Sequence, residues 1–161
     1  MEEKNIPSRK PNRLRNFKYD SIGVYFITIC TKNKERLFWD NVGASIARPH
    51  EELTKIGATV KECIESIPKV YKAVSICNYV IMPNHIHLLL RVHDTDGRAM
   101  LAPTVSRVVQ QLKGAVTKRI GECIWQKLFY DHIVRNSEEY NVIDTYINNN
   151  PQSWEKDELY N

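Results

Sequence analysis

The feature that most constrains this chain is an apolar stretch at residues 79–91, which a proline and an asparagine divide in two. Pro83 and Asn84 suit a turn, because proline fixes φ and asparagine tolerates unusual backbone angles. The apolar residues on either side therefore predict the two strands of a hairpin. His85 and His87 stand at alternate positions of the second strand, so we expect their side chains to share one face of a sheet.

Two histidines on one strand face can bind one metal ion together. Their Cβ atoms would lie roughly 6–7 Å apart, which lets both imidazoles lean toward the same ion. Such a pair needs at least one further protein ligand. Two buried histidines without any ion produce the same spacing, so the pattern alone leaves both interpretations open.

Length and composition place the chain among ordinary globular proteins. Its 161 residues suit one compact domain, and 42% hydrophobic and 26% charged residues are usual for a soluble protein. No apolar run is long enough to cross a bilayer, and the N-terminal residues lack the apolar core of a signal peptide. We therefore expect a cytoplasmic protein without a membrane partner. The scattered cysteines are expected to be reduced: Cys30, Cys63, Cys77 and Cys123.

Residues 1–20 are polar and basic and contain two prolines, so we expect an arm rather than a helix or strand. With a net charge of +4, the chain tolerates a polyanionic partner. Basic side chains of the arm could follow a phosphate backbone, although a solvated tail has the same composition. The candidates for DNA binding are Arg9, Lys10, Arg13 and Arg15, together with Lys113, Lys118 and Arg119 of a later helix.

The remaining pattern alternates strands and helices. β-branched and aromatic residues predict a strand at 23–31 and a short one within 125–135. Helical spacing of apolar residues predicts helices at 51–67, ended by Pro68, and at 104–120. A last helix begins after Asn136, and Glu139 completes a capping-box pattern. We therefore predict one α+β domain over residues 21–161, with an antiparallel β-sheet and helices packed on one face, related to the ferredoxin-like plan.

The last predicted helix offers partners for the histidine pair. Tyr146 and Asn150 are four residues apart, which places them on the same helix face. The amide oxygen of Asn150 would complete a site of two imidazoles and one carbonyl, a set that suits Mg²⁺ or Mn²⁺. Pro151 disfavours helical geometry at Asn150, so we expect some distortion of this spacing. A core tyrosine and an asparagine at a helix end explain the same pattern without any site.

Residues 82–87 resemble the histidine motif of single-tyrosine HUH transposases, and the branch they resemble most is the REP-associated tyrosine transposases. The likeness also includes a tyrosine followed by four residues that end in Asn-Pro, at positions 146–151. It extends to residues 19–20, 23–29 and 130–136 and covers most of residues 9–151. The resemblance implies the fold of an HUH endonuclease.

By this resemblance, His85 and His87 bind the metal ion and Tyr146 is the catalytic nucleophile. Asn150 is implied as the third metal ligand, where the insertion-sequence enzymes usually have glutamine. His132 falls in a shared stretch and is expected to be a neighbour of the site or a core residue. The implied activity is cleavage and transfer of single-stranded DNA, often beside a hairpin, through a 5′-phosphotyrosine intermediate. The implied reaction requires Mg²⁺ or Mn²⁺.

Several alternatives stay open at this stage. A catalytically silent relative would bind palindromic DNA repeats with the same fold, and a metallohydrolase would use the histidines without Tyr146. An RNA-binding module could have a similar sheet-and-helix fold, but the sequence lacks the clustered sheet aromatics of an RNP motif. Tyr140 is the second candidate nucleophile, but it lies six residues before Tyr146 and therefore on nearly the opposite side of the helix. The chain length fits a homodimer or a monomer.

Overall fold

The computed structural model describes residues 22–40, 53–94 and 105–159. The predicted basic arm, with Arg9, Lys10, Arg13 and Arg15, lies outside these residues. The elements follow one another as β1 (Gly23–Cys30), η1 (Lys32–Lys34), α1 (Lys55–Val70), β2 (Val74–Ile81), β3 (His85–Val92), α2 (Val105–Ile120), β4 (Tyr130–Val134), α3 (Ser137–Asn149) and η4 (Pro151–Lys156). None of the helices within the described ranges is both long and apolar enough to cross a membrane.

The four strands form one antiparallel sheet in the order β2-β3-β1-β4. The predicted hairpin joins β2 and β3 through Pro83 and Asn84, and the N–H of Met82 donates to the carbonyl of His85 at 2.8 Å. β3 lies inside the sheet, and nearly all its side chains are buried. This strand therefore contributes to the packing on both faces.

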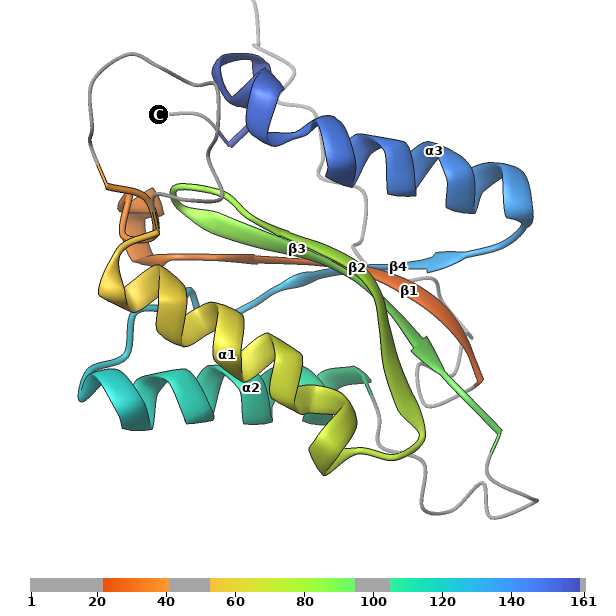
Figure 1. Cartoon of the computed structure of the whole chain (residues 1–161), viewed down its shortest axis with the longest axis horizontal. Helices are drawn as coiled ribbons and strands as arrows, with labels where there is room; N and C mark the ends of the chain where they lie inside the picture. Colours follow the sequence, from red (N-terminus) through yellow and green to blue (C-terminus); the bar gives the residue numbers. More distant parts are fainter. Residues whose placement is uncertain (1–21, 41–52, 95–104, 160–161) are drawn as a thin grey trace, which may run out of the picture.

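Helices cover both faces of the sheet. α1 and α2 lie against one face, and α3 crosses the other (Figure 1). The α+β class and the antiparallel sheet are confirmed, but the prediction that the helices pack on one face was wrong for α3. The reason is that the central hairpin has apolar side chains on both faces of the sheet. Ile86 and Leu88 belong to the core under α1 and α2, whereas Leu89, Val80 and Met82 pack with α3.

A bulge in β2 helps to hold α3 in place. The strand register shifts between Ile76 and Asn78, and the Asn78 side chain reaches α3. Its Nδ2 donates to Asp144 Oδ1 at 2.7 Å and to Asn148 Oδ1 at 2.9 Å, while its Oδ1 accepts from the N–H of Tyr79 at 2.8 Å. One asparagine thus fixes the middle of the helix over the sheet.

The predicted cap at the start of α3 is present. The N–H of Glu139 donates to Asn136 Oδ1 at 2.8 Å. In return, Glu139 Oε2 accepts from the N–H of Arg135 at 2.7 Å. This reciprocal arrangement resembles a capping box, except that the glutamate bonds the residue before the cap.

The end predicted for the first helix was wrong. α1 continues through Pro68 to Val70. A proline costs the helix one backbone hydrogen bond. Pro68 lies in the last turn of α1, so the lost bond is near the end of the helix. The N–H of Tyr71 still donates to the carbonyl of Ile67 at 2.9 Å and closes the helix.

The contact between the start of α1 and Phe38 generates a prediction. A Cβ atom at Gly57 would overlap the carbonyl oxygen of Phe38, whereas a Cβ at Gly114 in α2 would meet no atom within 4 Å. Gly57→Ala should therefore lower the free energy of unfolding by about 1–3 kcal/mol, because backbone must shift. Gly114→Ala should raise it by about 0.5–1 kcal/mol, because alanine favours the helix. Urea unfolding of both variants tests this, and a stabilising Gly57→Ala would contradict the close packing.

Candidate functional site

His85 and His87 project from β3 onto the face under α3. Both are buried, and their Nε2 atoms lie 3.1 Å apart. The alternation of side chains along a strand explains the shared face. The contact brings together the two nitrogen atoms that a metal ion would bind.

Asn84 fixes the protonation of His85. The Asn84 Nδ2 donates to the carbonyl of Leu159 at 2.9 Å, which orients the amide so that its Oδ1 faces His85. This oxygen lies 2.7 Å from His85 Nδ1. An amide oxygen can only accept, so His85 Nδ1 carries a proton and, in the neutral ring, Nε2 keeps its lone pair. The lone pair points toward the neighbouring groups of the site.

Thr28 supports His87 from the adjacent strand. The two residues are paired between β1 and β3, and Thr28 Oγ1 lies 2.8 Å from His87 Nδ1. A hydroxyl can donate or accept, so Thr28 is compatible with either neutral form of His87. Such outer partners commonly orient the histidines of metal sites.

Both imidazoles are neutral at physiological pH. Burial lowers the pKa of His85 to about 2, with further contributions from His87 and Lys34. Burial also lowers the pKa of His87 to about 3. Neutral imidazole is the form that binds metal ions.

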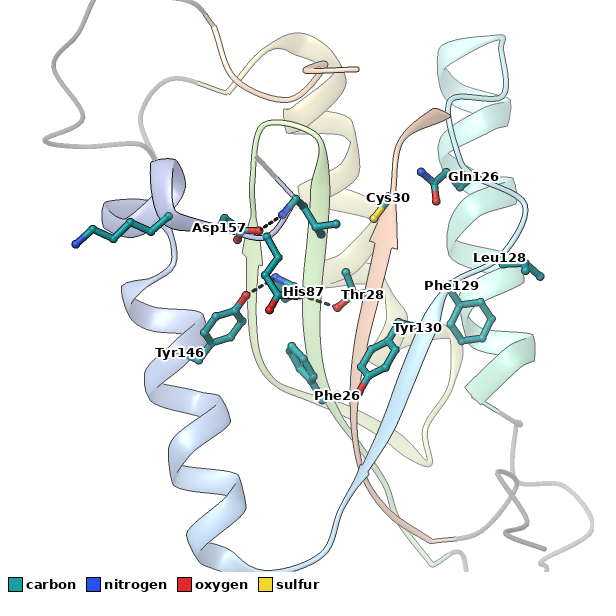
Figure 2. A pocket seen from close by; sticks show the side chains of 13 residues that line it. Phe26, Thr28, Cys30, His87, Gln126, Leu128, Phe129, Tyr130, Tyr146 and Asp157 are labelled. Atoms are coloured by element: carbon teal, nitrogen blue, oxygen red, sulfur yellow. Dashed lines mark hydrogen bonds between the residues drawn. The ribbon is translucent and has the colours of Figure 1, made fainter. Parts of the chain in front are cut away.

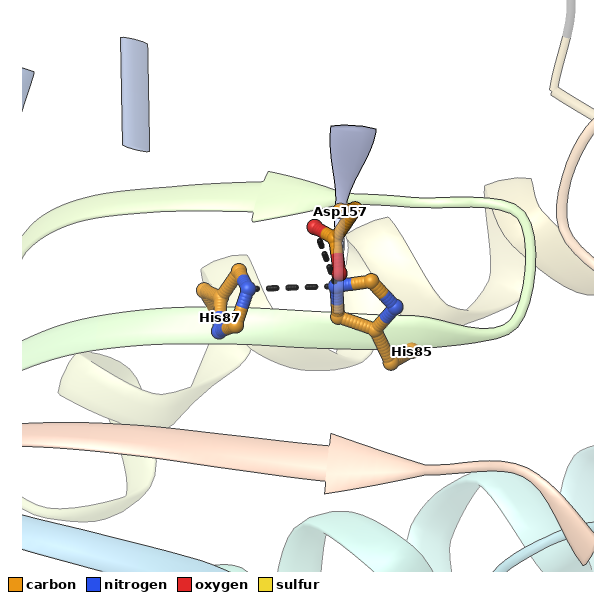
Figure 3. A group of neighbouring side chains, drawn as sticks. All are labelled: His85, His87 and Asp157. Carbon is orange, nitrogen blue, oxygen red and sulfur yellow. Dashed lines mark hydrogen bonds and ion pairs between the residues drawn. The ribbon is translucent and has the colours of Figure 1, made fainter. Parts of the chain in front are cut away.

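Asp157 completes a cluster of three potential metal ligands (Figure 3). One ligand atom from each of His85, His87 and Asp157 lies within 4.8 Å of the other two. The Asp157 side chain is 2% exposed, and its Oδ2 lies 3.7 Å from His85 Nε2. Its Oδ1 accepts from the N–H of Leu159 at 2.7 Å, whereas Oδ2 has no hydrogen-bond partner in the described part of the chain.

This arrangement fits a cation. The lone pair of His85 Nε2 and the buried oxygen of Asp157 repel each other unless a proton or a metal ion lies between them. Burial raises the pKa of the Asp157 carboxyl, because a buried negative charge is costly, while the Leu159 N–H and the Asn150 amide offset part of this rise. Two imidazole nitrogens and one carboxylate oxygen are a common ligand set for divalent transition metals. The residues present therefore fit a divalent metal ion.

The sequence interpretation did not include Asp157. This residue follows the last predicted helix in a short run with Glu155 and Glu158, where no spacing distinguishes one acid from another. Its place depends on η4, which turns back toward the hairpin after α3 (Figure 1). Only tertiary structure separates it from its acidic neighbours.

Tyr146 and Asn150 lie next to the histidine pair. The Tyr146 hydroxyl is 3.5 Å from His87 Nε2, and the residue is still 45% exposed. Burial raises the pKa of Tyr146, and the negative charge of Asp157 raises it further. The nearby Asn150 amide lowers the same pKa. Asn150 is buried and keeps helical angles, with φ −58° and ψ −43°, although Pro151 follows. The N–H of Asn150 donates to the carbonyl of Ile147, three residues back, at 3.4 Å, so the helix tightens at its last residue before Pro151.

An open pocket of about 800 Å³ surrounds the Tyr146 hydroxyl and His87 (Figure 2). Its floor is formed by alternate residues of β1: Phe26, Thr28 and Cys30. Tyr146 and the segment around Asp157 form one side, and residues 126–130 contribute the other. The candidate nucleophile is thus accessible to a ligand of substantial size.

The other predicted residues lie elsewhere. Lys118 is exposed on α2, and Arg119 pairs with Glu62 at 2.8 Å, on the far side of the sheet from the histidines. Lys113 is turned toward the back of the pocket, where its Nζ donates to the carbonyl of Gln126 at 2.8 Å. The structure therefore does not bring the three basic residues of α2 together at the site.

His132 and Tyr140 also stand apart from the pocket. His132 Nε2 lies 2.5 Å from Glu139 Oε1, so this histidine supports the start of α3. Tyr140 packs with the apolar cluster beneath α3 and lines a separate cavity of about 440 Å³ together with Arg91 and Arg135. Of the two candidate nucleophiles, Tyr146 is therefore the one beside the histidine pair.

Comparisons with known proteins agree on one family. Residues 23–150 match the family model described as "Transposase IS200 like". A Haemophilus influenzae protein of unassigned function is 36% identical over 175 aligned positions, which cover 96% of this chain and 94% of that protein. Another protein of this organism, provisionally named a REP-associated tyrosine transposase, is 25% identical over 145 positions, which cover 80% of this chain and 70% of that protein.

A solved structure supports the same fold. It is the structure of a REP-associated tyrosine transposase bound to a REP hairpin, and the two chains superpose with a TM-score of 0.62. Their sequences are 22% identical, and the match covers 82% of this chain and 68% of that chain. At this identity, the likeness shows the shared fold.

The contact between Asn84 and His85 predicts one tautomer. At neutral pH, long-range ¹H–¹⁵N spectra should show His85 protonated at Nδ1 and bare at Nε2, because Asn84 Oδ1 can only accept. Asn84→Ala should mix the two tautomers of His85. His93, which contacts Ser75 on the sheet edge, serves as an internal reference and should not change. A wild-type His85 protonated at Nε2 would contradict the assigned hydrogen bond, even if the variant did not fold.

Proposed function

Because this chain belongs to the family of IS200-like transposases, we propose that it cuts and rejoins single-stranded DNA through a covalent bond between Tyr146 and a 5′-phosphate. In this proposal, His85 and His87 hold a divalent metal ion, either Mg²⁺ or Mn²⁺. The observation that carries it is the Tyr146 hydroxyl, 3.5 Å from His87 Nε2 at the edge of an open pocket. Nucleophile and metal ligands meet although 59 positions separate them in the chain.

The tyrosine needs help to react. The pKa of a phenol is about 10, and burial raises that of Tyr146, so the hydroxyl is protonated at neutral pH. A divalent ion on the histidines would neutralise charge that develops on the phosphate oxygens. Tyr146 Oη attacks phosphorus and loses its proton, while the bond from phosphorus to the 3′-oxygen breaks and that oxygen leaves as a 3′-hydroxyl. A 3′-hydroxyl can later reverse the step, so no nucleotide cofactor is consumed.

For the third metal ligand, the structure offers an alternative to Asn150. Asp157 presents a buried carboxylate oxygen without a hydrogen-bond partner in the described residues, 3.7 Å from His85 Nε2. A negatively charged oxygen binds a divalent ion more strongly than a neutral amide does, and it offsets the cost of burying the ion. We therefore assign Asp157 as the third ligand. Asn150 would then position Tyr146 and Asp157, whose pKa values its amide lowers.

The proposed substrate is single-stranded DNA next to a hairpin. A structural relative is bound to a REP hairpin, and it shares the fold over 82% of this chain. A protein that only binds such repeats would keep the fold and lose the reaction. The half-exposed Tyr146, with its hydroxyl 3.5 Å from His87 Nε2, favours the enzyme.

Formation of a covalent adduct tests the activity. Wild-type protein, Mn²⁺ and a labelled DNA hairpin with single-stranded flanks should give a protease-sensitive band on a denaturing gel. Tyr146→Phe and His87→Ala should abolish the band, as should EDTA. Tyr140→Phe is the matched control and should keep the band, because Tyr140 lies outside the pocket. Tight hairpin binding by all four proteins without any adduct would identify a silent DNA-binding protein instead.

Direct measurement of metal binding tests the ligand assignment. By Mn²⁺ titration followed by electron paramagnetic resonance without DNA, Asp157→Asn should weaken binding at least about 10-fold, the loss caused even by removing groups that only support ligands. Glu158→Gln is the matched control, because Glu158 lines the same pocket but does not belong to the three-ligand cluster. Unchanged affinity in Asp157→Asn, with a loss in Asn150→Ala, would return the third position to Asn150.

A further inference from the structure

The pocket is larger than the reaction centre requires. Its volume of about 800 Å³ falls in the range of sites that enclose a whole organic ligand. A phosphate group and a metal ion fill only part of this space. His87, Tyr146 and Asp157 lie toward one side of it, and the opposite side has no role in the proposed reaction (Figure 2).

The opposite side is apolar and open. Leu128 is 77% exposed and Tyr130 is 40% exposed, and both line the pocket. Half-buried Phe26 lies between them and the reaction centre, with its ring centre 5.2 Å from that of His87. Around this space the lining residues from β1 and from residues 126–130 carry no charged side chain. Exposed apolar side chains that line a pocket mark a binding surface, and without a cation this one does not suit a phosphate.

The surface is held in position from behind. The wall of the pocket on this side consists of residues 126–130. The N–H of Gln126 donates to the carbonyl of Cys30 at 2.9 Å, which joins this wall to the end of β1. Lys113 Nζ donates to the carbonyl of Gln126 at 2.8 Å and lies 5.8 Å from the centre of the Phe129 ring. This basic residue therefore supports the wall from α2. A preformed wall costs a ligand little ordering.

The register of the sheet sets the distance to the reaction centre. Thr28 pairs with His87 on one side and with Tyr130 on the other, so the three residues form one row across β3, β1 and β4. Two strand spacings separate Tyr130 from His87, or about 10 Å. This distance is within the size of one nucleotide.

We propose that Phe26, Leu128 and Tyr130 form a subsite for one unpaired nucleobase, next to the phosphate that Tyr146 attacks. The inference rests on the proposed function and adds how the strand is positioned. A base leaves the stack of its neighbours and packs against the Tyr130 ring and the Leu128 side chain. Stacking of bases on aromatic side chains tolerates any sequence and strengthens binding by about 5- to 150-fold per base.

The test compares two single-stranded probes of equal length, one of thymidine nucleotides and one of abasic nucleotides. Fluorescence anisotropy in EDTA measures both affinities without cleavage. Wild-type protein should bind the thymidine probe more tightly, by about 5- to 150-fold. Tyr130→Ala and Leu128→Ala should lose much of this preference while their affinity for the abasic probe stays the same. Tyr130→Phe should keep the preference, because it keeps the ring.

Controls separate the subsite from folding and from the reaction. Val142→Ala removes another exposed aliphatic side chain, 66% exposed on α3 and outside the pocket, and should behave as wild type. Leu128 is so exposed that its loss should not unfold the protein, whatever happens to Tyr130→Ala.

Failure of the subsite and failure of the proposed strand transfer give different results. Equal binding of both probes by wild type, or a full preference in Tyr130→Ala and Leu128→Ala, would overturn the subsite, even if the covalent adduct forms. A preference that depends on Tyr130, in a protein that forms no adduct, would support the subsite and contradict strand transfer. Where the adduct forms, one abasic nucleotide beside the phosphate linked to Tyr146 should weaken binding more than one placed elsewhere.

Discussion

The structure depends on one strand that is buried on both faces. Toward α1 and α2, β3 supplies Ile86, Leu88 and Leu90 to the main core. Toward α3 it supplies Leu89 and the two histidines. A strand in this position cannot slip by one residue, because the slip would exchange the imidazoles with core side chains. The register that builds the core therefore also fixes the site.

Local patterns were sufficient to predict the parts of the site that lie within single elements. Alternation along residues 85–91 predicted the shared face of His85 and His87, and helical spacing predicted the shared face of Tyr146 and Asn150. The cap at Asn136 followed from its own side chain and Glu139. Each of these features depends on neighbours close in sequence, where backbone geometry leaves few alternatives.

Features that arise between distant elements could not be predicted. Asp157 reaches His85 only because η4 turns after α3, and Tyr130 shares a row with His87 only because β4 and β3 both pair with β1. Lys113 carries the positive charge expected of a DNA-binding residue, yet its Nζ donates to the carbonyl of Gln126 within the protein. The division of the helices between two faces likewise follows from the apolar residues on both sides of β3, which the helical patterns do not report.

The position of Asp157 has a consequence for protein synthesis. The histidine pair and its supporting Thr28 are translated before α2, β4 and α3, whereas the carboxylate comes after α3. A growing chain on the ribosome thus contains two imidazoles that still lack their acidic neighbour and the tyrosine. The cluster forms only when residues 146–159 have emerged and folded back over β3.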